Sequence, residues 1–218
     1  MKTVALIPVK LNNERLPGKN IKPFDNGKPL IHYILTTLSK VDRCEQVYVY
    51  CSDECIKEYL PENVTFIKRD SALDRPDCNS IDISKSFCQF VDADIYIYTH
   101  ATAPFITPES INKGLDAVVS NKYDSAFSVT ENYSFLWVDG RPNYDLEHLP
   151  RTQDMKPFFI ESCGFWIYTR ELILRHARRI GFHPAMITVS SVEALDIDGK
   201  IDFDIANAVF NHILAPLT

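Results

Sequence analysis

Three basic residues lie close together near the N-terminus, directly after an apolar stretch. Residues 3–9 have the length and composition of a buried strand, and Lys10, Arg15 and Lys19 follow in the next loop. Ligands of open α/β sheets bind beyond the carboxyl ends of the strands, and Gly18 permits close approach of the backbone. The three cations would therefore suit a triphosphate and the charge of a transition state at its α-phosphorus. The alternative is a solvated basic loop, since this is neither a Walker A motif nor a Rossmann glycine fingerprint.

A pair of carboxylates lies near the other end of the chain. Asp196 and Asp198 are two positions apart, so their side chains share one face of an extended backbone. Mg²⁺ takes a few carboxylate oxygens and completes its octahedron with phosphates and water, which this spacing allows. The alternative is an acidic turn before a helix, with Asp202 near the helix N-terminus.

The elements that must position these groups alternate along the chain. Apolar runs of strand length are separated by amphipathic runs of helix length, a pattern typical of a parallel sheet with crossover helices. We predict strands at residues 3–9, 46–51, 64–68, 94–99, 125–130, 158–168 and 185–189. We predict helices at residues 30–39, 53–59, 81–91, 108–120, 170–179 and 203–214.

The pattern changes between about residue 131 and residue 157. This stretch is rich in aromatic residues, Asn, Asp and Pro, and Asp139-Gly140 predicts a hairpin turn. Its aromatic residues Tyr133, Phe135, Trp137 and Tyr144 are too many for a small segment to bury alone, so they predict an interface or packing onto the core. We therefore expect one Rossmann-like α/β nucleotide-binding domain over residues 1–218, with a mainly parallel central sheet and a β-rich excursion.

Composition excludes several classes of protein. The net charge of −6 argues against a general nucleic-acid binder, although clustered cations can still hold a nucleotide. No apolar run approaches the roughly 18 residues of a membrane span, and the N-terminus does not read as a secretion signal. The six cysteines lack CxxC or zinc-site spacing, so we expect reduced thiols and a cytoplasmic location.

The N-terminal loop resembles the signature of the acylneuraminate cytidylyltransferase (CMP-sialic acid synthetase) family. Matching positions are Pro8, Pro17, Gly18, Lys19 and Asn20. Lys10 stands where the family usually has Arg, and Asn13 where it usually has Ser. The run from Arg15 to Lys19 is also similar to the CMP-Kdo synthetase version.

The acidic element and three middle segments extend the resemblance. The stretch from Glu193 to Phe203 is similar to the family's Glu-Ser-Ile-Asp-Ile-Asp element. Arg75-Pro76 followed by Asp82 resembles a nucleotide-facing segment, although Ser80 and Asp82 could instead cap a helix. Thr102 and Pro104 match a segment in which His100, Ala103 and Ile106 replace Gln, Ser and Arg. The segment with Arg151, Gln153 and Asp154 resembles the family's Arg-Arg-Gln-Asp-x-Pro.

The resemblance implies a fold of the nucleotide-diphospho-sugar transferase type and a Mg²⁺-dependent reaction. A cytidylyl group would pass from CTP to the anomeric hydroxyl of a 2-keto-3-deoxy sugar acid, in a homodimer whose excursion reaches over the neighbouring active site. Lys10, Arg15 and Lys19 are then the expected catalytic residues, and Asp196 and Asp198 the expected metal ligands. Expected nucleotide contacts are Lys10, Asn13, Arg15, Lys19, Asn20, Arg75 and Asp82. Expected acceptor contacts are His100, Thr102, Arg151, Gln153 and Asp154, of which His100 is also a candidate general base or a structural histidine.

Three other functions remain open at this stage. The first is a CMP-Kdo synthetase or a cytidylyltransferase for another nonulosonate, such as legionaminate or pseudaminate. The second is a metal-dependent glycosyltransferase of type A fold, which would normally carry its DxD pair in mid-chain. The third is a non-catalytic nucleotide-binding homologue, which Ile106 and Ser162 favour because they replace family residues.

Overall fold

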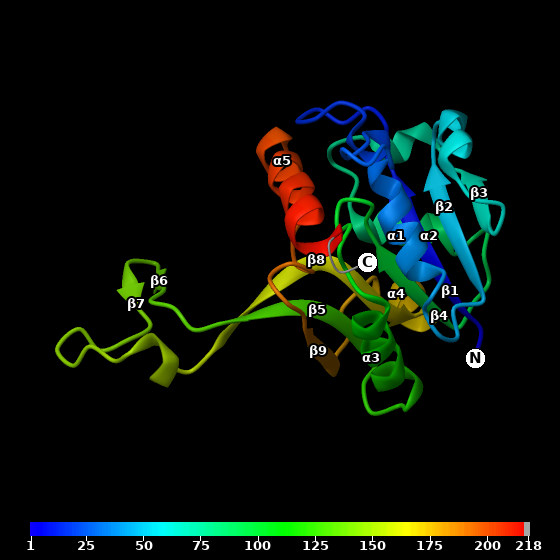
Figure 1. The fold of residues 1–218 in the computed structure, drawn as a ribbon. Coiled ribbons are helices and arrows are strands. Elements are labelled where there is room, and N and C mark those ends of the chain that lie inside the picture. Colours follow the sequence, from blue (N-terminus) through cyan, green and yellow to red (C-terminus); the bar gives the residue numbers. More distant parts are fainter. Residues whose placement is uncertain (216–218) are drawn as a thin grey trace.

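The N-terminal apolar run forms β1 (Thr3–Val9), a central strand of a mixed sheet. The computed structural model describes residues 1–215, and within them seven strands form one sheet in the order β3-β2-β1-β4-β8-β5-β9. The other strands are β2 (Gln46–Cys51), β3 (Val64–Lys68), β4 (Ile95–Thr99), β5 (Ser125–Asn132), β8 (Phe158–Thr169) and β9 (Pro184–Thr188). Strand β8 is antiparallel to β4 and β5, and the remaining pairs are parallel (Figure 1).

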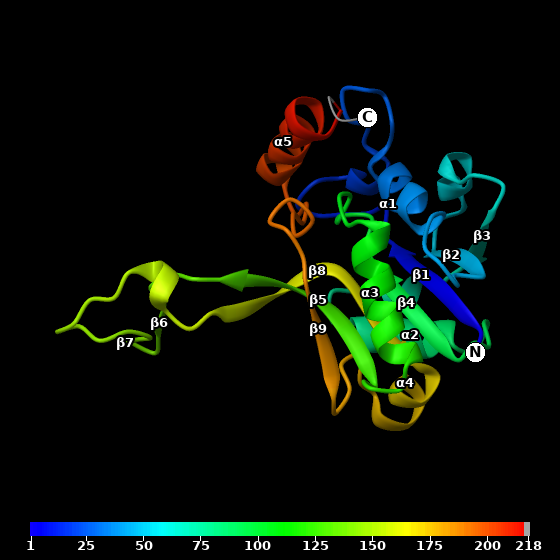
Figure 2. The same cartoon turned by 60° about the horizontal axis from the view of Figure 1, so that its bottom comes forward.

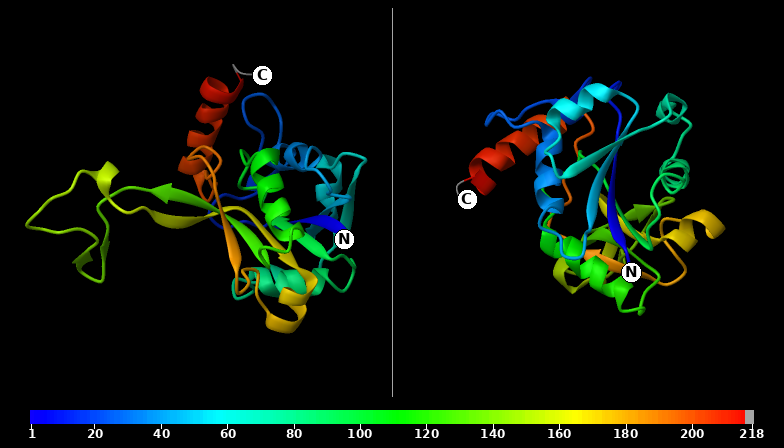
Figure 3. Two further views of the ribbon diagram at one scale, coloured as in Figure 1. Left: turned by 90° about the horizontal axis from the view of Figure 1, so that it is seen from below. Right: turned by 90° about the vertical axis from the view of Figure 1, so that its right-hand side faces the viewer.

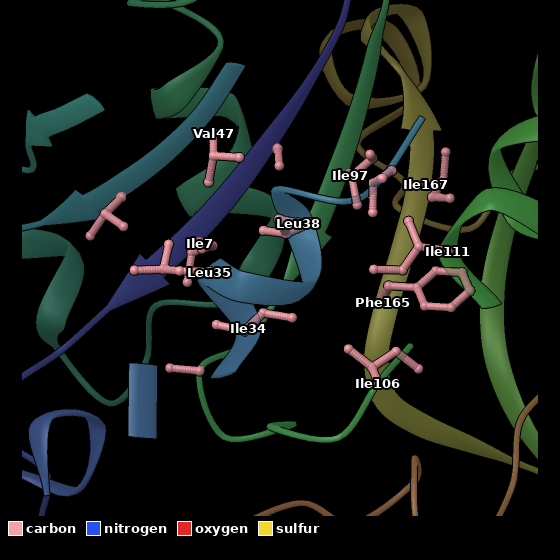
Figure 4. Packing of buried hydrophobic residues seen from close by; sticks show 14 of the residues in the cluster. Ile7, Ile34, Leu35, Leu38, Val47, Ile97, Ile106, Ile111, Phe165 and Ile167 are labelled. Carbon is pink, nitrogen blue, oxygen red and sulfur yellow. The ribbon is translucent and has the colours of Figure 1, made fainter. Parts of the chain in front are cut away.

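Helices cover both faces of the sheet. On one face α1 (Leu30–Leu38) and α3 (Pro108–Val119) pack against alternate residues of the strands, including Ile7, Ile97 and Phe165 (Figure 4). On the other face α2 (Ser80–Phe87) and α4 (Arg170–His176) pack against a layer that contains Tyr98 and Trp166. Because every central strand is covered twice, its residues are apolar without alternation, and the sheet ends are left to carry the polar groups.

The predicted α/β class and mainly parallel sheet are confirmed, and the elements follow the predicted order. Four boundaries differ by more than one residue. Strand β5 continues to Asn132, α2 stops at Phe87, α4 stops at His176, and the last helix, α5 (Lys200–Val209), starts earlier and continues as a π-helix over Phe210–Leu214. The segment predicted as a helix at residues 53–59 is a 3₁₀ helix over residues 54–59. Ala177 ends α4 because it adopts the left-handed conformation, with φ 52°. This helix end was not predicted because no proline or glycine marks it in the sequence.

Strands β5 and β8 are two sides of one long hairpin, which is why β8 is antiparallel. They remain paired from Ser125–Tyr168 in the sheet to Asn132–Phe158 beyond it, with a register shift between Phe127 and Val129. The chain between them carries the short strands β6 (Trp137–Val138) and β7 (Arg141–Pro142), joined by the predicted turn at Asp139-Gly140. We call residues 131–157 the arm, and it projects away from the body of the protein (Figures 1 and 3).

The end of the chain returns to its beginning. Phe203 of α5 packs against Phe24 and shares a small apolar cluster with Leu30 and Phe105. This packing brings α5 beside the loop that follows β1 (Figure 2). Two regions that carry charged motifs are thereby neighbours, although nearly the whole sequence separates them.

The helices and the cysteines bear on the environment of the chain. None of the helices described in residues 1–215 is both long and apolar enough to cross a membrane. All six cysteines lie within the described residues and are free thiols.

The close packing of α3 on the sheet leads to a stability prediction. A Cβ added at Gly114 would lie 2.9 Å from Ile167 Cδ1 and from Phe165 Cε2, both in the core. Overpacking costs about 1–3 kcal/mol, whereas replacing a helical glycine gains only about 0.5–1 kcal/mol. Gly114→Ala should therefore lower the free energy of unfolding by about 1 kcal/mol in urea titrations. Lys113→Ala, on the exposed side of α3, is the control and should be near neutral; a stabilised Gly114→Ala would contradict the packing argument.

Candidate active site

A cavity of about 400 Å³ opens at the carboxyl ends of β1 and β4. Pro8 and Lys10 line it from the end of β1, and Tyr98 and His100 line it from the end of β4. The chain leaves β1 towards β2 on one side, while β4 lies on the other side, so the cavity is at a topological switch point of the sheet. This is the position where doubly wound folds bind their ligands.

The loop after β1 holds two lysines at fixed positions in this cavity. Lys19 is only 9% exposed, and its Nζ donates to the carbonyl oxygen of Ile197 at 2.6 Å. Gly18 has φ 66°, which favours glycine, and the turn it makes starts the short 3₁₀ helix that carries Lys19 and Asn20. Asn20 Nδ2 donates to the carbonyl oxygen of Lys10 at 2.8 Å, and Lys10 Nζ donates to the carbonyl oxygen of Asp74 at 2.6 Å. The loop is therefore preorganised by its own side chains.

The carboxylates Asp196 and Asp198 face the same cavity. Asp198 Oδ2 lies 2.7 Å from Arg15 Nη1, and Asp198 Oδ1 lies 3.7 Å from Lys19 Nζ. Asp196 Oδ1 is buried and has no hydrogen-bond partner among residues 1–215. An unpartnered buried carboxylate oxygen is costly, so this atom is suited to a cation.

A third observation limits what kind of metal site this can be. The described residues contain no group of three or more His, Cys, Asp or Glu side chains placed to hold a metal ion. A divalent ion at this pair would therefore need further oxygen ligands from a nucleotide or from water. Mg²⁺ is commonly coordinated in this way.

The segment that carries the two carboxylates is anchored on both sides. Glu193 accepts from Thr107 Oγ1 at 2.7 Å and from Ser110 Oγ at 2.6 Å with one carboxylate oxygen, and from the N–H of Ser190 at 3.0 Å with the other. Burial alone would raise the pKa of Glu193, but the hydrogen bonds from Ser110, Ser190 and Thr107 outweigh it and hold the pKa below its usual value. Glu193 thus fastens the segment to the N-terminus of α3.

The far end of the segment is fastened by the start of α5. Asp202 Oδ2 accepts from the N–H groups of Asp198 and Gly199 at 3.1 and 2.8 Å, forming the expected helix cap. The N–H of Ile197 donates to the carbonyl oxygen of Thr102 at 2.9 Å. The backbone on either side of Asp196 and Asp198 is therefore held in place.

His100 lies between the charged groups of the cavity and is neutral at physiological pH. Its pKa is lowered to about 4, chiefly by burial; the charge of Asp196 opposes this shift, and the positive charges of Arg179 and Lys19 add to it. The nearby Cys163 thiol also stays protonated, because burial and the charge of Asp196 raise its pKa to about 12. The cavity therefore offers a neutral imidazole and no thiolate nucleophile.

Most of the residues predicted from the sequence meet in this one cavity. Its lining includes Lys10, Asn13, Lys19, Asn20, Arg75, His100, Thr102, Asp196 and Asp198. Arg15 lies in an adjoining pocket of about 240 Å³, which Lys10, Asn13 and Asp198 also line.

The remaining predicted residues lie elsewhere. The Asp82 carboxylate accepts from the N–H of Asn79 at 3.2 Å in a capping box, where Asn79 and not Ser80 is the N-cap. Arg151, Gln153 and Asp154 lie on the arm, where Arg151 Nε is 2.7 Å from Asp154 Oδ2. The nucleotide role of Asp82 and the acceptor roles of the arm residues stay predictions.

Arg69 is a lining residue that the sequence analysis missed. It follows β3 directly and is 3% exposed; its Nη2 donates to the carbonyl oxygen of Val9 at 3.0 Å and also contacts the Asp74 carboxylate. Its Nε is buried without a partner among the described residues. The rule that ligands bind beyond strand ends could have identified it, because the end of β3 was predicted correctly.

The fold has relatives among solved structures. CMP:2-keto-3-deoxy-manno-octonic acid synthetase, solved in complex with CTP, matches with a TM-score of 0.75 at 17% identity, over 98% of this chain and 100% of that chain. The 4-diphosphocytidyl-2C-methyl-D-erythritol synthase of Anaerococcus prevotii matches with a TM-score of 0.71 at 12% identity, over 96% of each chain. These similarities define the chain as an α/β protein with the fold of cytidylyltransferases.

The sequence identifies the family. The profile of the cytidylyltransferase family matches residues 4–209, so the chain belongs to the cytidylyltransferase family, a class of nucleotidyltransferase enzymes.

Individual relatives are distant. The N-acylneuraminate cytidylyltransferase of Oncorhynchus mykiss is 25% identical over 213 residues, covering 93% of this chain but 49% of that protein. The 3-deoxy-manno-octulosonate cytidylyltransferase 2 of Hydrogenovibrio crunogenus is 28% identical, covering 82% of this chain and 68% of that protein. The pseudaminic acid cytidylyltransferase of Campylobacter jejuni is 24% identical, covering 97% and 98%. The chain thus spans about half the length of the first relative and nearly all of the last.

The anchoring role of Glu193 leads to a prediction with a defined pH dependence. Glu193→Gln places an amide N–H₂ among donors, and losing charge-assisted hydrogen bonds should cost about 1–3 kcal/mol of stability at neutral pH. Because the folded-state pKa lies below the ordinary 4.5, the carboxylate stabilises the fold above that pH and loses its effect as the pH falls through the folded-state value. Urea titrations should show a difference between wild type and variant at neutral pH that shrinks in acid. A difference that is constant or grows in acid would refute the role.

Proposed function

We propose that this chain transfers a cytidylyl group from CTP to the anomeric hydroxyl of a 2-keto-3-deoxy sugar acid, giving a CMP-sugar and pyrophosphate. The observation that carries the proposal is the meeting of basic and acidic groups from opposite ends of the chain in one cavity at the switch point. The three relatives above are named for acids of this class, N-acylneuraminate, 3-deoxy-manno-octulosonate and pseudaminic acid.

Phosphate binding is assigned to the basic residues of the cavity. Lys10 and Lys19 bind the triphosphate, together with Arg75 and Arg69, which line the same cavity. The side chain of Arg15 is 69% exposed, so it is free to turn from Asp198 to a phosphate oxygen. Asn13 Oδ1 is buried and unpartnered among the described residues, which suits a hydrogen bond from the nucleotide.

Asp196 and Asp198 would hold Mg²⁺, since one carboxylate oxygen lacks a partner and the other carboxylate is half-exposed beside it. When bound, the ion supplies positive charge to the triphosphate oxygens. Lys19 also supplies positive charge to the triphosphate, and it does so from a fixed position, because its Nζ donates to the carbonyl oxygen of Ile197 between the two carboxylates. The protein acts mainly by positioning and by offsetting charge.

The reaction itself is a displacement at the α-phosphorus. The anomeric oxygen forms the new bond to phosphorus, the bond to the β-phosphate oxygen breaks, and the hydroxyl proton must leave. His100 is the neutral imidazole in the cavity and is available to accept that proton. Thr102, on the same strand end, is assigned to orienting the acceptor.

A pyrophosphate-release assay tests both the reaction and the metal pair. Wild-type protein with CTP and Mg²⁺ should release pyrophosphate with at least one acid from a panel of N-acylneuraminate, 3-deoxy-manno-octulosonate and pseudaminate. Asp196→Asn and Asp198→Asn should each lower kcat by at least about 100-fold, because they remove charge held where it develops in the transition state. Asp204→Asn, an exposed carboxylate on α5 paired with Lys200, is the matched control and should keep full activity.

Each alternative function gives a different result in that assay. Turnover only with 3-deoxy-manno-octulosonate would make the chain a CMP-Kdo synthetase. If no acid of the panel leads to release of pyrophosphate, but the protein transfers the sugar from a supplied nucleotide sugar, the chain is a glycosyltransferase. Nucleotide binding without any turnover would indicate a non-catalytic homologue, and wild-type rates in both aspartate variants would remove the metal assignment.

We further propose that the arm pairs two copies of this chain. Its aromatic residues Tyr133, Phe135 and Trp137 are 44%, 42% and 54% exposed, and Leu146 and Leu149 are exposed as well. Apolar groups in this number on a projecting hairpin favour an interface. A partner arm would also give Arg151, Gln153 and Asp154 a route to the neighbouring cavity, consistent with their expected acceptor roles.

Sedimentation velocity tests the pairing. Phe135→Ser combined with Trp137→Ser removes two exposed rings and should shift the protein from dimer to monomer, because the apolar area that drives association is lost. Phe90→Ser, an exposed ring away from the arm, is the control and should leave the mass unchanged. A monomeric wild type, or an unshifted arm variant, would refute the pairing.

A further inference from the structure

Arg179 is held in a fixed position on the α2 and α4 side of the sheet. Its guanidinium carbon lies 4.0 Å from the centroid of the Trp166 ring, a stacked cation–π contact. Its Nη2 lies 2.7 Å from Glu161 Oε1, and the same oxygen accepts from Trp166 Nε1 at 2.8 Å. Trp166 and Glu161 thus fix the plane and the direction of the guanidinium.

This guanidinium is not itself a lining residue of the active-site cavity, but it contacts residues that adjoin the lining. The His100 ring packs edge-on against Trp166, with centroids 5.6 Å apart, and the charge of Arg179 acts on His100 and Cys163, both of which line the cavity. Nη1 reaches Ser80 Oγ at 3.3 Å, at the start of the helix that lines the cavity with Ile83. Arg179 therefore lies close to His100, with the Trp166 ring in contact with both.

Its environment differs from that of a purely structural arginine. The side chain is 31% exposed, and its contact with Ser80 is long, so the guanidinium retains capacity for a further acceptor. The cations assigned to phosphate binding come from the loops after β1 and β3, whereas Arg151 lies on the arm, outside the residues that line this chain's own cavity. Arg179 is thus a cation near His100 that comes from neither of the loops assigned to phosphate binding.

We propose that Arg179 binds the carboxylate of the acceptor and so restricts this site to sugar acids. The inference rests on the proposed function. In a 2-keto-3-deoxy sugar acid the carboxylate is attached to the anomeric carbon, so a group that holds it also positions the attacking hydroxyl. A planar, preorganised guanidinium fits a carboxylate with two parallel hydrogen bonds. Glu161 shares the charge of Arg179 and sets its direction, which tunes the strength of that contact.

Steady-state kinetics with the acid that the wild type uses best separates this role from a structural one. Arg179→Gln should raise KM for the acid about 10- to 100-fold, the loss expected for a charged hydrogen bond, while KM for CTP stays unchanged. Arg179→Lys keeps the charge without the planar fork and should fall between the two. Glu161→Gln removes the competing carboxylate yet can still accept from Trp166, so KM for the acid should stay or fall. Arg175→Gln, an exposed arginine of α4 paired with Glu171, is the matched control and should match wild type.

Fluorescence provides a binding measurement that does not depend on turnover. The chain has two tryptophans, so in a Trp137→Phe background Trp166 is the sole reporter, and it lies directly under Arg179. In the presence of CTP, each acid of the panel is titrated alongside N-acetylmannosamine, a neutral sugar. The acid should give a saturable signal that Arg179→Gln weakens, and the neutral sugar should give none.

The outcomes divide cleanly. Equal changes in KM for CTP and for the acid, equal effects of Arg179→Gln and Glu161→Gln, or acid binding that survives Arg179→Gln would each overturn the inference. Unfolding curves of each variant identify losses due to misfolding, and the lysine variant then decides the case. Acid binding that depends on Arg179 without pyrophosphate release would sustain this inference while refuting the proposed reaction. Absence of any acid-dependent signal would overturn the inference itself.

Discussion

The contact on which the rest of the site depends is the hydrogen bond from Lys19 Nζ to the carbonyl oxygen of Ile197. It joins positions 178 residues apart and is buried. Asp196 and Asp198 flank that carbonyl, so the same ammonium group that would face a triphosphate also fixes the backbone of the acidic pair. Because the N–H of Ile197 is bound to Thr102, the segment is held from both sides, by the loop after β1 and by the loop after β4. The two strands at the switch point therefore determine where the carboxylates lie.

The antiparallel strand β8 shapes the part of the site where we propose that the acceptor binds. A parallel strand at this position would need a crossover, whereas the hairpin with β5 lets the chain leave the sheet as an arm and return beside β4. The register shift between Phe127 and Val129 brings Glu161 to the face that carries Trp166, where it can orient Arg179. The groups proposed to bind the nucleotide thus lie on loops after parallel strands, whereas Trp166 and Glu161, which orient Arg179, lie on the strand that runs antiparallel to its neighbours in the seven-stranded sheet.

The sequence allowed most of the fold and most of the residues that line the cavity to be predicted, because these depend on local signals. Strand runs, the Pro108 helix start and the Asp139-Gly140 turn each carry their own chemistry, and strand ends point to ligand-binding loops. The orientation of β8 was not predictable from its composition, since a buried strand is apolar in either direction. Arg69 and Arg179 were missed because each is recognised only in three dimensions. Arg69 is recognised by its burial at the end of β3, and Arg179 by its stacking on the ring of Trp166, which is distant in the sequence. The sequence alone did not decide whether Asp82 caps a helix or faces a ligand. In the structure Asn79 is the N-cap, and Asp82 completes a capping box with it.

The charges of the site explain how an acidic protein can present a cluster of cations without losing stability. Each basic group of the cavity already has an acceptor in the protein: Lys10 has the carbonyl oxygen of Asp74, Lys19 that of Ile197, and Arg15 the carboxylate of Asp198. These pairs lower the repulsion between like charges and fix their positions before any ligand binds, which is what electrostatic preorganisation requires. A triphosphate with its metal would bring anionic oxygens to the cations and a cation to the carboxylates. Each charged group of the site would therefore exchange its partner in the protein for a ligand group that interacts with it in the same way. Asp196 Oδ1, Asn13 Oδ1 and Arg69 Nε are the exceptions, buried and unpartnered among the described residues, and they are where an incoming ligand has the most to gain.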